Sequence, residues 1–273
     1  MNSSPFSYLM DDPREAARLA EKVNAQEWLH NYFTPHLQGA RRVLDVGCGP
    51  AVIAAEIARA HPEAEVCGID GSHSRIEEAQ RNLGKLSNGS AQAADARKLP
   101  FESNRFDFAY SRFLLEYLAE PNNAVDEMAR VCRPGGRVLL QDLDGQLVWH
   151  HPVDQELQSD IELTLSHLAK TGFDPFIGRK LFSLALGAGL INVSVRIDPY
   201  HLFAGRIDDQ SFRLWELKLD IALPAVARAL GSDDAARKLK ARFLDYLRRE
   251  DTLTYSILFT VSGIKPYSSE PSS

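Results

Sequence analysis

The sequence is poor in cysteine and lacks a long hydrophobic run. Its three cysteines, Cys48, Cys67 and Cys132, are odd in number and form no CxxC pair, so neither a disulfide framework nor a metal site is predicted. The longest apolar run, Leu181 to Ile191, is much shorter than the roughly 20 residues that span a bilayer. We therefore expect free thiols in a reducing, cytoplasmic setting and no membrane insertion.

An excess of basic residues is also absent. The chain has 31 Lys and Arg against 37 Asp and Glu, a formal net charge of -6, and therefore no basic footprint for a nucleic-acid partner. Residues 1–13 contain no basic segment followed by an apolar one, so no targeting signal is expected. With 273 residues, 44% of them hydrophobic, the chain can bury a sizeable core. The oligomeric state is left open.

Segments of helical and strand character alternate along the first half of the chain. A helix from Asp12 to Phe33 is predicted first. Strands are then expected at 42–46, 65–70, 91–95, 105–111 and 137–143, with helices at 52–60, 75–83 and 123–132 between them. Such alternation with short links is typical of a parallel sheet covered on both faces. Ligands of such sheets bind at the carboxyl ends of the strands.

The second half departs from this alternation. A helix is predicted at 177–188 and strands at 192–197 and 252–262, and between the two strands lie two apolar stripes of helical spacing. One contains Trp215, Leu219, Leu223, Val226 and Leu230, and the other Leu239, Phe243, Leu244 and Leu247. We therefore expect an N-terminal helical cover (1–38), a core (39–205 and 252–266), a helical insertion acting as a lid (206–251) and a frayed tail (267–273).

The stretch Val43 to Ala51 joins the first strand to the next helix through Gly47 and Gly49, with Asp45 near the strand end. Glycines allow a ligand to approach the backbone, and the following helix start offers free N–H groups. A dinucleotide site would need a third glycine at position 52, which is Val52, and Asp45 would lie close to the pyrophosphate. The carboxylate instead suits a ligand with an ammonium or sulfonium charge, such as S-adenosylmethionine.

Residues 43–136 resemble the core of the class I S-adenosylmethionine-dependent methyltransferases, close to the ubiquinone/menaquinone-type branch and its small-molecule relatives. The resemblance rests on four motifs in the order of that family: Val43–Gly49, Val66–Asp70, Ala94–Phe101, and Arg105–Phe108 followed by Arg130–Gly136. It implies an α/β, Rossmann-like, doubly wound sheet of seven strands in the order 3-2-1-4-5-7-6, with strand 7 antiparallel. The late strand at 252–262 fits that position.

The resemblance also implies roles for single residues. Asp45 and the glycine backbone would hold the methionine part of the cofactor, Asp70 would accept from the ribose hydroxyls, and Asp95 with Ala96 would bind the adenine. The residues predicted to bind S-adenosylmethionine, and its product S-adenosylhomocysteine, are Tyr8, Arg18, Asp45, Gly47, Cys48, Gly49, Asp70, Gly71, Arg75, Asp95, Ala96 and Ser111. Two positions depart from the family: Ala51 replaces a third glycine, and Gly71 replaces an apolar residue.

Each candidate has a simpler interpretation beside the functional one. Strand-end acids commonly cap the next helix, and Arg18 can lie on a solvated helix face instead of pairing with the cofactor carboxylate. His150 and His151, just past the fifth strand, are a solvated pair or a base. Glu116 and Tyr117 are the other candidate bases.

The predicted reaction is methyl transfer by direct displacement to a small, largely apolar acceptor molecule, with a base needed only for a hydroxyl or a carbon acid. The aromatic content of the leading helix and of the insertion indicates the apolar acceptor. Two alternatives remain: a fold relative that binds the cofactor without methylating or without being an enzyme, and a nicotinamide-dependent oxidoreductase. The acceptor and the atom methylated stay open.

Overall fold

The computed structural model describes Asp12, Arg14, Arg18 and residues 24–267. Within these residues the strands form one seven-stranded sheet in the order β3-β2-β1-β4-β5-β7-β6. Strand β7 is antiparallel to both β5 and β6, and the strand pairs from β3 through β5 are parallel. The predicted strand order and the antiparallel seventh strand are confirmed. The strands are β1 (Arg42–Val46), β2 (Glu65–Asp70), β3 (Gly89–Ala93), β4 (Phe106–Arg112), β5 (Cys132–His151), β6 (Ile191–Ala204) and β7 (Leu253–Ile264).

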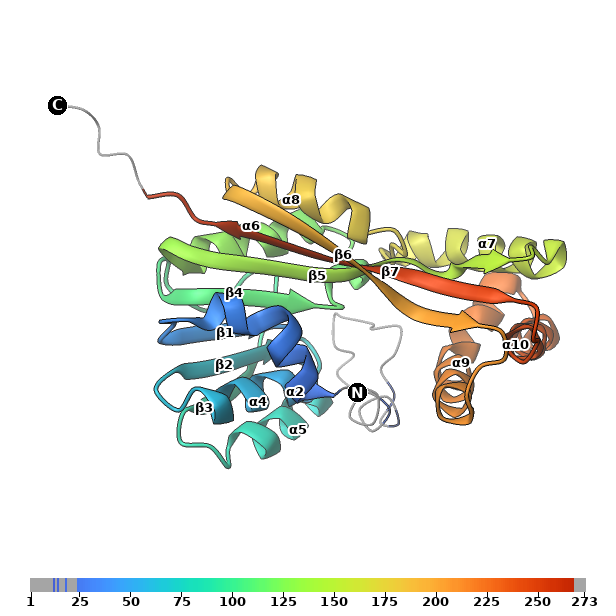
Figure 1. Ribbon diagram of the computed structural model, residues 1–273, viewed down its shortest axis with the longest axis horizontal. Coiled ribbons are helices and arrows are strands. Elements are labelled where there is room, and N and C mark those ends of the chain that lie inside the picture. The colour runs from blue at the N-terminus through green and yellow to red at the C-terminus, as the bar shows by residue number, and fades with distance from the viewer. Residues whose placement is uncertain (1–11, 13, 15–17, 19–23, 268–273) are drawn as a thin grey trace.

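Helices cover both faces of the sheet (Figure 1). One core cluster joins one face to helices α6 and α8, and the other joins the opposite face to the N-terminal helices, α4 and α5. Central strands are apolar throughout because both of their faces are covered; Val43, Leu44 and Val46 of β1 are fully buried. The helices and helical turns are α2 (Ala25–Trp28), η1 (Leu29–Phe33), α3 (Thr34–Leu37), α4 (Val52–Ala60), α5 (His73–Leu83), η2 (Leu115–Tyr117), α6 (Pro121–Val131), α7 (Gln155–Leu168), η3 (Ala169–Thr171), η4 (Gly178–Lys180), α8 (Leu181–Gly187), α9 (Asp209–Leu230) and α10 (Asp233–Leu247).

The single helix predicted from Asp12 to Phe33 is wrong. Asn24 is extended, and its side chain caps a new helix by accepting from the N–H of Glu27. From there the helical path continues to Leu37. An asparagine that can bond a backbone N–H three residues ahead favours a helix start over a helix interior.

Strands β5 and β6 run much further than predicted. The pattern ended the fifth strand at Leu143, before Gly145, but β5 resumes its pairing with β7 at Trp149 after an irregularity. Strand β6 likewise continues past Ile197 to Ala204. The long central partner β7 pairs with both strands, so backbone hydrogen bonding extends the sheet beyond the point where the local pattern breaks.

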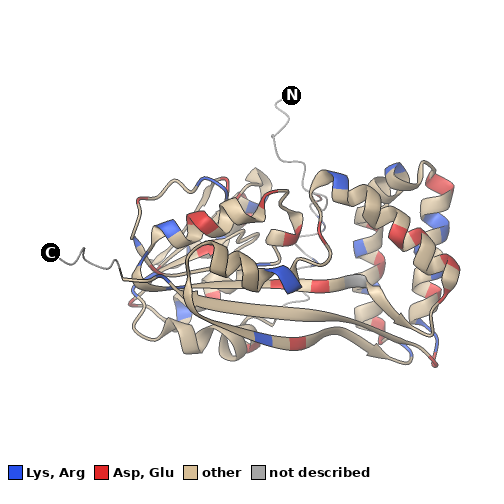
Figure 2. Cartoon of the chain, turned by 90° about the horizontal axis from the view of Figure 1, so that it is seen from above, with Lys and Arg blue, Asp and Glu red and all other residues tan. Residues whose placement is uncertain are grey.

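The extended ends of β5, β6 and β7 lie beside the helices α7, α9 and α10, at the end of the molecule away from β3 (Figure 1). The two predicted stripes meet there in a third hydrophobic cluster that includes Trp215, Leu239 and Phe243. Side chains of Asp154, Asp208 and Ser232 cap the starts of α7, α9 and α10. Figure 2 shows charges of both signs dispersed over the outer faces of these helices.

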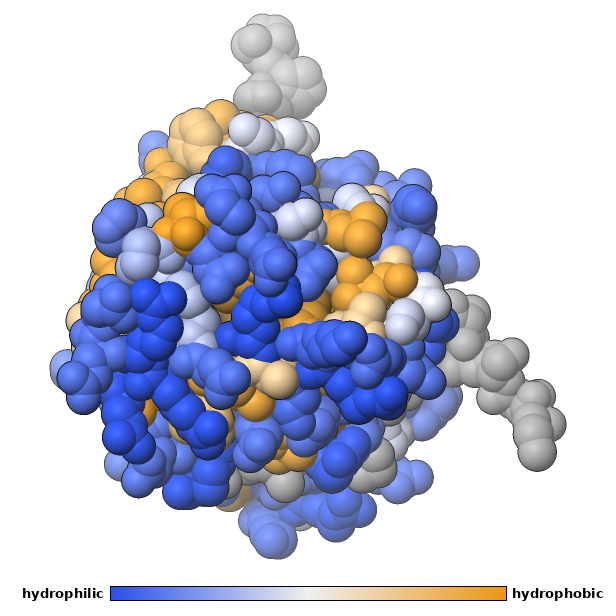
Figure 3. Space-filling view, turned by 90° about the vertical axis from the view of Figure 1, so that its right-hand side faces the viewer, coloured by the Kyte–Doolittle hydropathy of each residue, from blue (hydrophilic) through white to orange (hydrophobic). Residues whose placement is uncertain are grey.

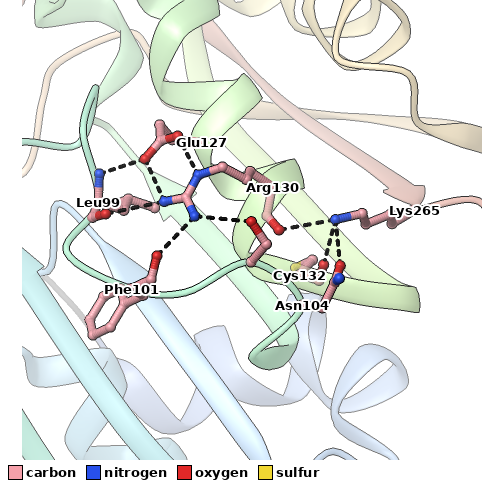
Figure 4. Close-up of polar contacts among 8 residues, drawn as sticks. Leu99, Phe101, Asn104, Glu127, Arg130, Cys132 and Lys265 are labelled. Carbon is pink, nitrogen blue, oxygen red and sulfur yellow. Dashed lines mark hydrogen bonds and ion pairs between the residues drawn. The ribbon is translucent and has the colours of Figure 1, made fainter.

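Arg130 at the end of α6 holds the loop that follows β3 (Figure 4). Its guanidinium donates to the carbonyls of Leu99 and Phe101, at 3.1 and 2.9 Å, and pairs with Glu127 at 2.6 Å. Glu127 in turn accepts from the N–H of Leu99 at 2.7 Å. Lys265 closes the network by donating to the carbonyls of Arg130 and Cys132. The loop that carries Asp95 is therefore held against α6.

The cysteines and the hydrophobic character of the helices were also considered in the sequence analysis. All three cysteines are free, as expected. In the part of the chain that the structure describes, none of the helices has the length and apolar character needed to cross a bilayer.

Candidate functional site

The turn between β1 and α4 brings backbone donors to the carboxyl end of the sheet. Gly47 and Gly49 have φ values of 77° and 53°, which glycine adopts without steric cost. The N–H groups of Gly47 and Cys48 donate to the carbonyl of Ile69 at 2.8 and 2.9 Å, which ties the turn to β2. Ala51 also lies in the left-handed region, with φ 58°, where a Cβ is strained. The missing third glycine thus falls at a position whose backbone favours glycine.

Asp45 is a buried acid beside this turn. Its side chain is 4% exposed and accepts from the hydroxyl of Tyr110 at 2.7 Å. Burial raises the pKa of Asp45 to about 7, although the Tyr110 hydrogen bond and the charge of Arg112 act in the opposite direction. A cationic ligand would offset that burial cost, because it would supply the opposite charge that the carboxylate needs.

Asp70 ends β2 and faces the same turn. Its two oxygens accept from the N–H groups of Gly49 and Ser72, both at 2.9 Å. The carboxylate therefore bonds the glycine turn and the residue before α5 instead of capping the helix, and it is positioned beside the glycine turn, where the ribose interaction is predicted. Gly71 next to it is exposed and Arg75 on α5 is partly buried.

Asp95 and Ala96 follow β3 on the loop that Arg130 fixes. The carboxylate of Asp95 accepts from the backbone N–H of Arg97 at 2.9 Å and pairs with its guanidinium at 3.0 Å. Burial would raise the pKa of Asp95, but the Arg97 contacts lower it overall. Ala96 is buried. The structure thus aligns Asp45, Asp70 and Asp95 along the ends of three neighbouring strands, as the motifs predict; their binding roles stay predictions.

A second polar group lies at the ends of β4, β5 and β6. Glu116 and Asp142 are 2% and 0% exposed, and Asp142 accepts from the N–H of Glu116 at 3.2 Å. Burial and the neighbouring charge of Glu116 raise the pKa of Asp142 well above its usual value. The Ser111 side chain, 1% exposed, has an Oγ with no hydrogen-bond partner among the described residues.

Of the two predicted residues in the N-terminal cover, Tyr8 lies outside the described residues. Arg18 is helical and only 6% exposed, so it does not lie on a solvated helix face. Its charge acts on the partly buried Tyr200 of β6, whose pKa burial raises to about 12. The pairing of Arg18 with the cofactor carboxylate remains a prediction.

His150 and His151 do not lie in a loop after the fifth strand, which corrects that expectation. Both belong to β5 and pair with Thr254 and Leu253 of β7. The Nδ1 atom of His150 lies 3.0 Å from Thr254 Oγ1, and its ring contacts Phe243 and Tyr246 of α10. His151 is exposed. The resumption of β5 after Gly145 has no local sequence signal, so the pattern placed these side chains wrongly.

An apolar cavity of about 90 Å³ lies between α7, α9 and α10. Tyr117, next to Glu116 in the chain, lines it together with Phe173 and Phe243, and most of its other lining side chains are aliphatic. Figure 3, which views the molecule from this end, shows a largely hydrophilic outer surface with separate hydrophobic patches. The outer surface at this end therefore has no continuous hydrophobic patch in this view.

Trp28 and Arg112 escaped the sequence analysis, whereas Tyr200 was considered with His201 as a residue that either faces a substrate or caps the strand. The indole of Trp28 donates to Gln141 Oε1 at 2.7 Å, and its ring lies 4.9 Å from the Arg112 guanidinium carbon and 6.1 Å from the ring of Tyr200. The only sequence signal was the position of Arg112 directly after Ser111 at a strand end. The predicted strand at 192–197 ended before Tyr200, so the sequence did not indicate that Tyr200 lies beside Trp28.

These features fit S-adenosylmethionine. Asp45, the glycine turn and two further strand-end acids can bind an adenosyl ligand with a positive charge; among the described residues Tyr110 donates a hydrogen bond to the Asp45 side chain. At Gly49 no described atom lies within 4 Å of where a Cβ would be, so a ligand can approach the backbone there.

Comparison with known proteins identifies the class. Residues 43–136 match the family described as "Methyltransferase domain". An uncharacterised methyltransferase of Schizosaccharomyces pombe is 27% identical, over 89% of this chain and 90% of that protein. A ubiquinone/menaquinone biosynthesis C-methyltransferase of Desulfotalea psychrophila is 36% identical, over 38% of this chain and 42% of that enzyme.

The fold has solved counterparts. The phosphoethanolamine N-methyltransferase 2 of Haemonchus contortus, in complex with phosphomonomethylethanolamine and S-adenosylhomocysteine, matches with a TM-score of 0.55 at 18% identity, over 96% of this chain and 62% of that one. The sequence match over residues 43–136, together with the shared fold, supports a class I S-adenosylmethionine-dependent methyltransferase. The match to the methyltransferase-domain family is confined to those residues, and S-adenosylmethionine is the methyl donor of that class.

Proposed function

We propose that this methyltransferase transfers the methyl group by direct displacement to a small, largely apolar acceptor molecule in the cytoplasm. The single observation that carries the acceptor class is the apolar cavity between α7, α9 and α10, which Tyr117 connects in sequence to the carboxyl ends of the sheet. Apolar pockets with few polar groups are characteristic of sites for small organic ligands.

We propose that the residues predicted from the motifs bind the cofactor. Asp45 and the turn Gly47–Gly49 would hold the methionine part, and Asp70 and Asp95 would hold the ribose and the adenine. S-adenosylmethionine supplies an electrophilic methyl group on a sulfonium. The protein's task is then to orient the acceptor in line with that group and to exclude water.

The helical segments around the acceptor would act as covers. We propose that residues 1–38 and 206–251 close over the core formed by 39–205 and 252–266. Trp28 supports this arrangement, because its bond to Gln141 attaches the N-terminal cover to β5, and Gln141 in turn donates to Thr260 of β7 at 2.7 Å. Helix α7, which the sequence analysis did not predict, packs with α9 and α10 in the third hydrophobic cluster and would belong to the same cover.

Among the candidate bases, burial favours Glu116. It lies next to Asp142 at the sheet end, whereas His150 lies against α10, where a ring hydrogen bond to Thr254 occupies one nitrogen. We therefore propose Glu116, with Tyr117 at the mouth of the cavity, as the first groups to test, ahead of His150 and His151.

A labelled-methyl assay tests the function. The protein and methyl-labelled S-adenosylmethionine are incubated with small-molecule extracts, and the labelled product is identified by mass spectrometry. We expect label in a compound of low polarity and none in the macromolecular fraction. Label confined to protein or nucleic acid would contradict the proposal. Calorimetry with S-adenosylhomocysteine serves as the control for an intact cofactor site.

A further inference from the structure

The carboxyl ends of β4, β5 and β6 carry polar groups that the cofactor motifs do not use. The predicted cofactor residues come mainly from β1, β2 and β3, whereas Arg112, Asp142 and Tyr200 come from β4, β5 and β6. The charges of Tyr200, Asp45, Tyr110 and Asp142 act on Arg112, which therefore also adjoins the predicted cofactor residue Asp45. Glu116 acts on Asp142 and on Tyr200. These residues therefore form one connected electrostatic cluster on the half of the site that borders the helical cover.

Arg112 is the unusual member of this cluster. Its guanidinium lies against the rings of Trp28 and Phe113, with the carbon Cζ 4.9 and 4.8 Å from their centroids, and these two rings contact each other. Its Nη1 atom is buried and has no hydrogen-bond partner among the described residues, and the same holds for Ser111 Oγ beside it. A buried donor on a charged group is costly to leave unpaired, so the arrangement is suited to an oxygen atom from a ligand.

The neighbouring carboxylates narrow the chemistry of that ligand. Glu116 and Asp142 are both buried, and Asp142 already accepts two backbone N–H groups, from Glu116 and Leu143. Two close acids do not both ionise easily, so the pair can take up a proton. An acceptor that is already a carboxylate would be repelled by the pair. An acidic hydroxyl, in contrast, enters neutral and can give up its proton there.

We propose that the acceptor is methylated on oxygen and is an apolar molecule bearing an acidic hydroxyl, a phenol or an enol, whose oxyanion is bound by Arg112. This proposal rests on the proposed function. The acceptor's O–H proton passes to the Glu116–Asp142 pair, and the oxygen uses its electron pair to bond to the methyl carbon. The bond between that carbon and sulfur breaks, its electron pair stays on sulfur, and S-adenosylhomocysteine and a methyl ether result. Arg112 is the catalytic residue of this step, because it touches the reacting oxygen.

The test uses 4-nitrophenol, whose phenolate absorbs at a longer wavelength than the neutral phenol. It is titrated into the full-length protein loaded with S-adenosylhomocysteine, at a pH where the free probe is neutral. We expect the phenolate spectrum to appear on binding. Arg112→Met should weaken binding at least about tenfold and abolish the phenolate signal. Glu116→Gln should leave the probe bound but neutral.

Matched variants separate this role from a structural one. Arg248 lies over the ring of Phe212 at 4.0 Å, outside the site, so Arg248→Met is the control and should behave like the wild type. Arg112→Lys keeps the charge and tests the site even where Arg112→Met fails to fold; we expect a weaker but detectable phenolate signal.

Three outcomes would overturn the proposal: a neutral bound probe in the wild type, equal affinities of the wild type and Arg112→Lys or Arg112→Met, or no binding of 4-nitrophenol. A further arm compares S-adenosylhomocysteine with 5′-methylthioadenosine, which lacks the carboxylate. If Arg112→Met lowers the affinity for S-adenosylhomocysteine but not the affinity for 5′-methylthioadenosine, Arg112 binds the cofactor carboxylate instead. Failure of the wild type to bind S-adenosylhomocysteine would count against the proposed function itself.

Discussion

At the scale of single residues, the site contains groups that are unfavourable without a ligand. Asp45 is buried with a raised pKa, Ala51 adopts a left-handed backbone, and Ser111 Oγ has no partner among the described residues. Such features cluster at functional sites because the surrounding structure compensates for their cost. Their replacement should therefore affect stability and ligand affinity in different directions.

The clearest case is Asp45→Asn. The folded-state pKa of Asp45 is about 7 against an ordinary value of 3.8, so the folded protein binds this proton more tightly than the unfolded chain does. Stability is therefore lost as pH rises from about 4 to about 7, by about 4 kcal/mol at most. Asparagine cannot ionise, so the variant should be the more stable protein at about pH 8 and should bind S-adenosylhomocysteine more weakly.

Urea unfolding at about pH 5 and about pH 8 measures the difference between the two proteins. The comparison cancels the other titrating groups, because they are the same in both. If the unfolding free energies of the wild type and Asp45→Asn change in parallel with pH, Asp45 does not carry the raised pKa.

Ala51→Gly should stabilise the protein. Left-handed backbone costs an L-residue roughly 1–2 kcal/mol, and the extra freedom of glycine in the unfolded chain offsets roughly 0.4–1 kcal/mol of the gain. We expect a net increase of about 0.5–1 kcal/mol in the free energy of unfolding. Denaturant titration measures it, with Ala227→Gly within α9 as the control, where glycine should destabilise. A loss of stability in Ala51→Gly would show that its Cβ contributes more by packing than the strain costs.

Asp70→Ala should weaken the binding of S-adenosylhomocysteine by roughly 1.5–3 kcal/mol, which is the contribution of one charge-assisted hydrogen bond. Calorimetry measures the affinity, and Asp245→Ala on the exposed face of α10 is the control. Because Asp70 also accepts from Gly49 and Ser72, Asp70→Asn is needed to retain part of that hydrogen bonding. Unchanged affinity in both variants would remove Asp70 from the cofactor site.

At the scale of elements, the proposed function assigns the two ligands to two sets of strands. The proposed cofactor residues lie mainly on the short strands β1, β2 and β3 and their turns, whereas the proposed acceptor cavity lies among the helices beside the long strands β5, β6 and β7 (Figure 1). Substitutions in α9 should therefore affect the acceptor without affecting the cofactor.

Ala222→Phe tests this separation, because Ala222 lines the apolar cavity and a larger side chain would fill it. We expect kcat/KM for the acceptor to fall at least about tenfold, which corresponds to about 1.4 kcal/mol of lost binding, while the affinity for S-adenosylhomocysteine stays the same. Ala227→Phe, on the same helix but outside the cavity lining, is the matched control. Equal activity of the two variants would place the acceptor elsewhere.

At the scale of the whole molecule, cofactor binding should stabilise the fold, because its predicted residues come from several elements. A ligand at about 100 times its Kd adds about 2.7 kcal/mol, which corresponds to a Tm increase of roughly 5–10 °C for a chain of this size. S-adenosylhomocysteine should give this shift in a thermal melt, and NADH should give none. A shift with NADH alone would support the oxidoreductase alternative over the cofactor assigned here.

The sequence by itself determined the sheet order, the glycine turn and the row of acids Asp45, Asp70 and Asp95. The strands and the glycine turn follow from local patterns, whereas the sheet order is what the resemblance to the methyltransferase family implies. It also predicted the two apolar stripes of the insertion, because helical periodicity is a local property.

Only the tertiary structure decided the acceptor side. Strand β5 resumes after Gly145 because β7 pairs with it, and that long-range pairing moved His150 and His151 out of the expected loop. The meeting of Trp28, Arg112 and Tyr200 joins residues from an N-terminal helix, β4 and β6 that no sequence spacing relates. Their burial, and with it the unpaired Arg112 Nη1, arises from packing between distant segments, which a local pattern does not encode.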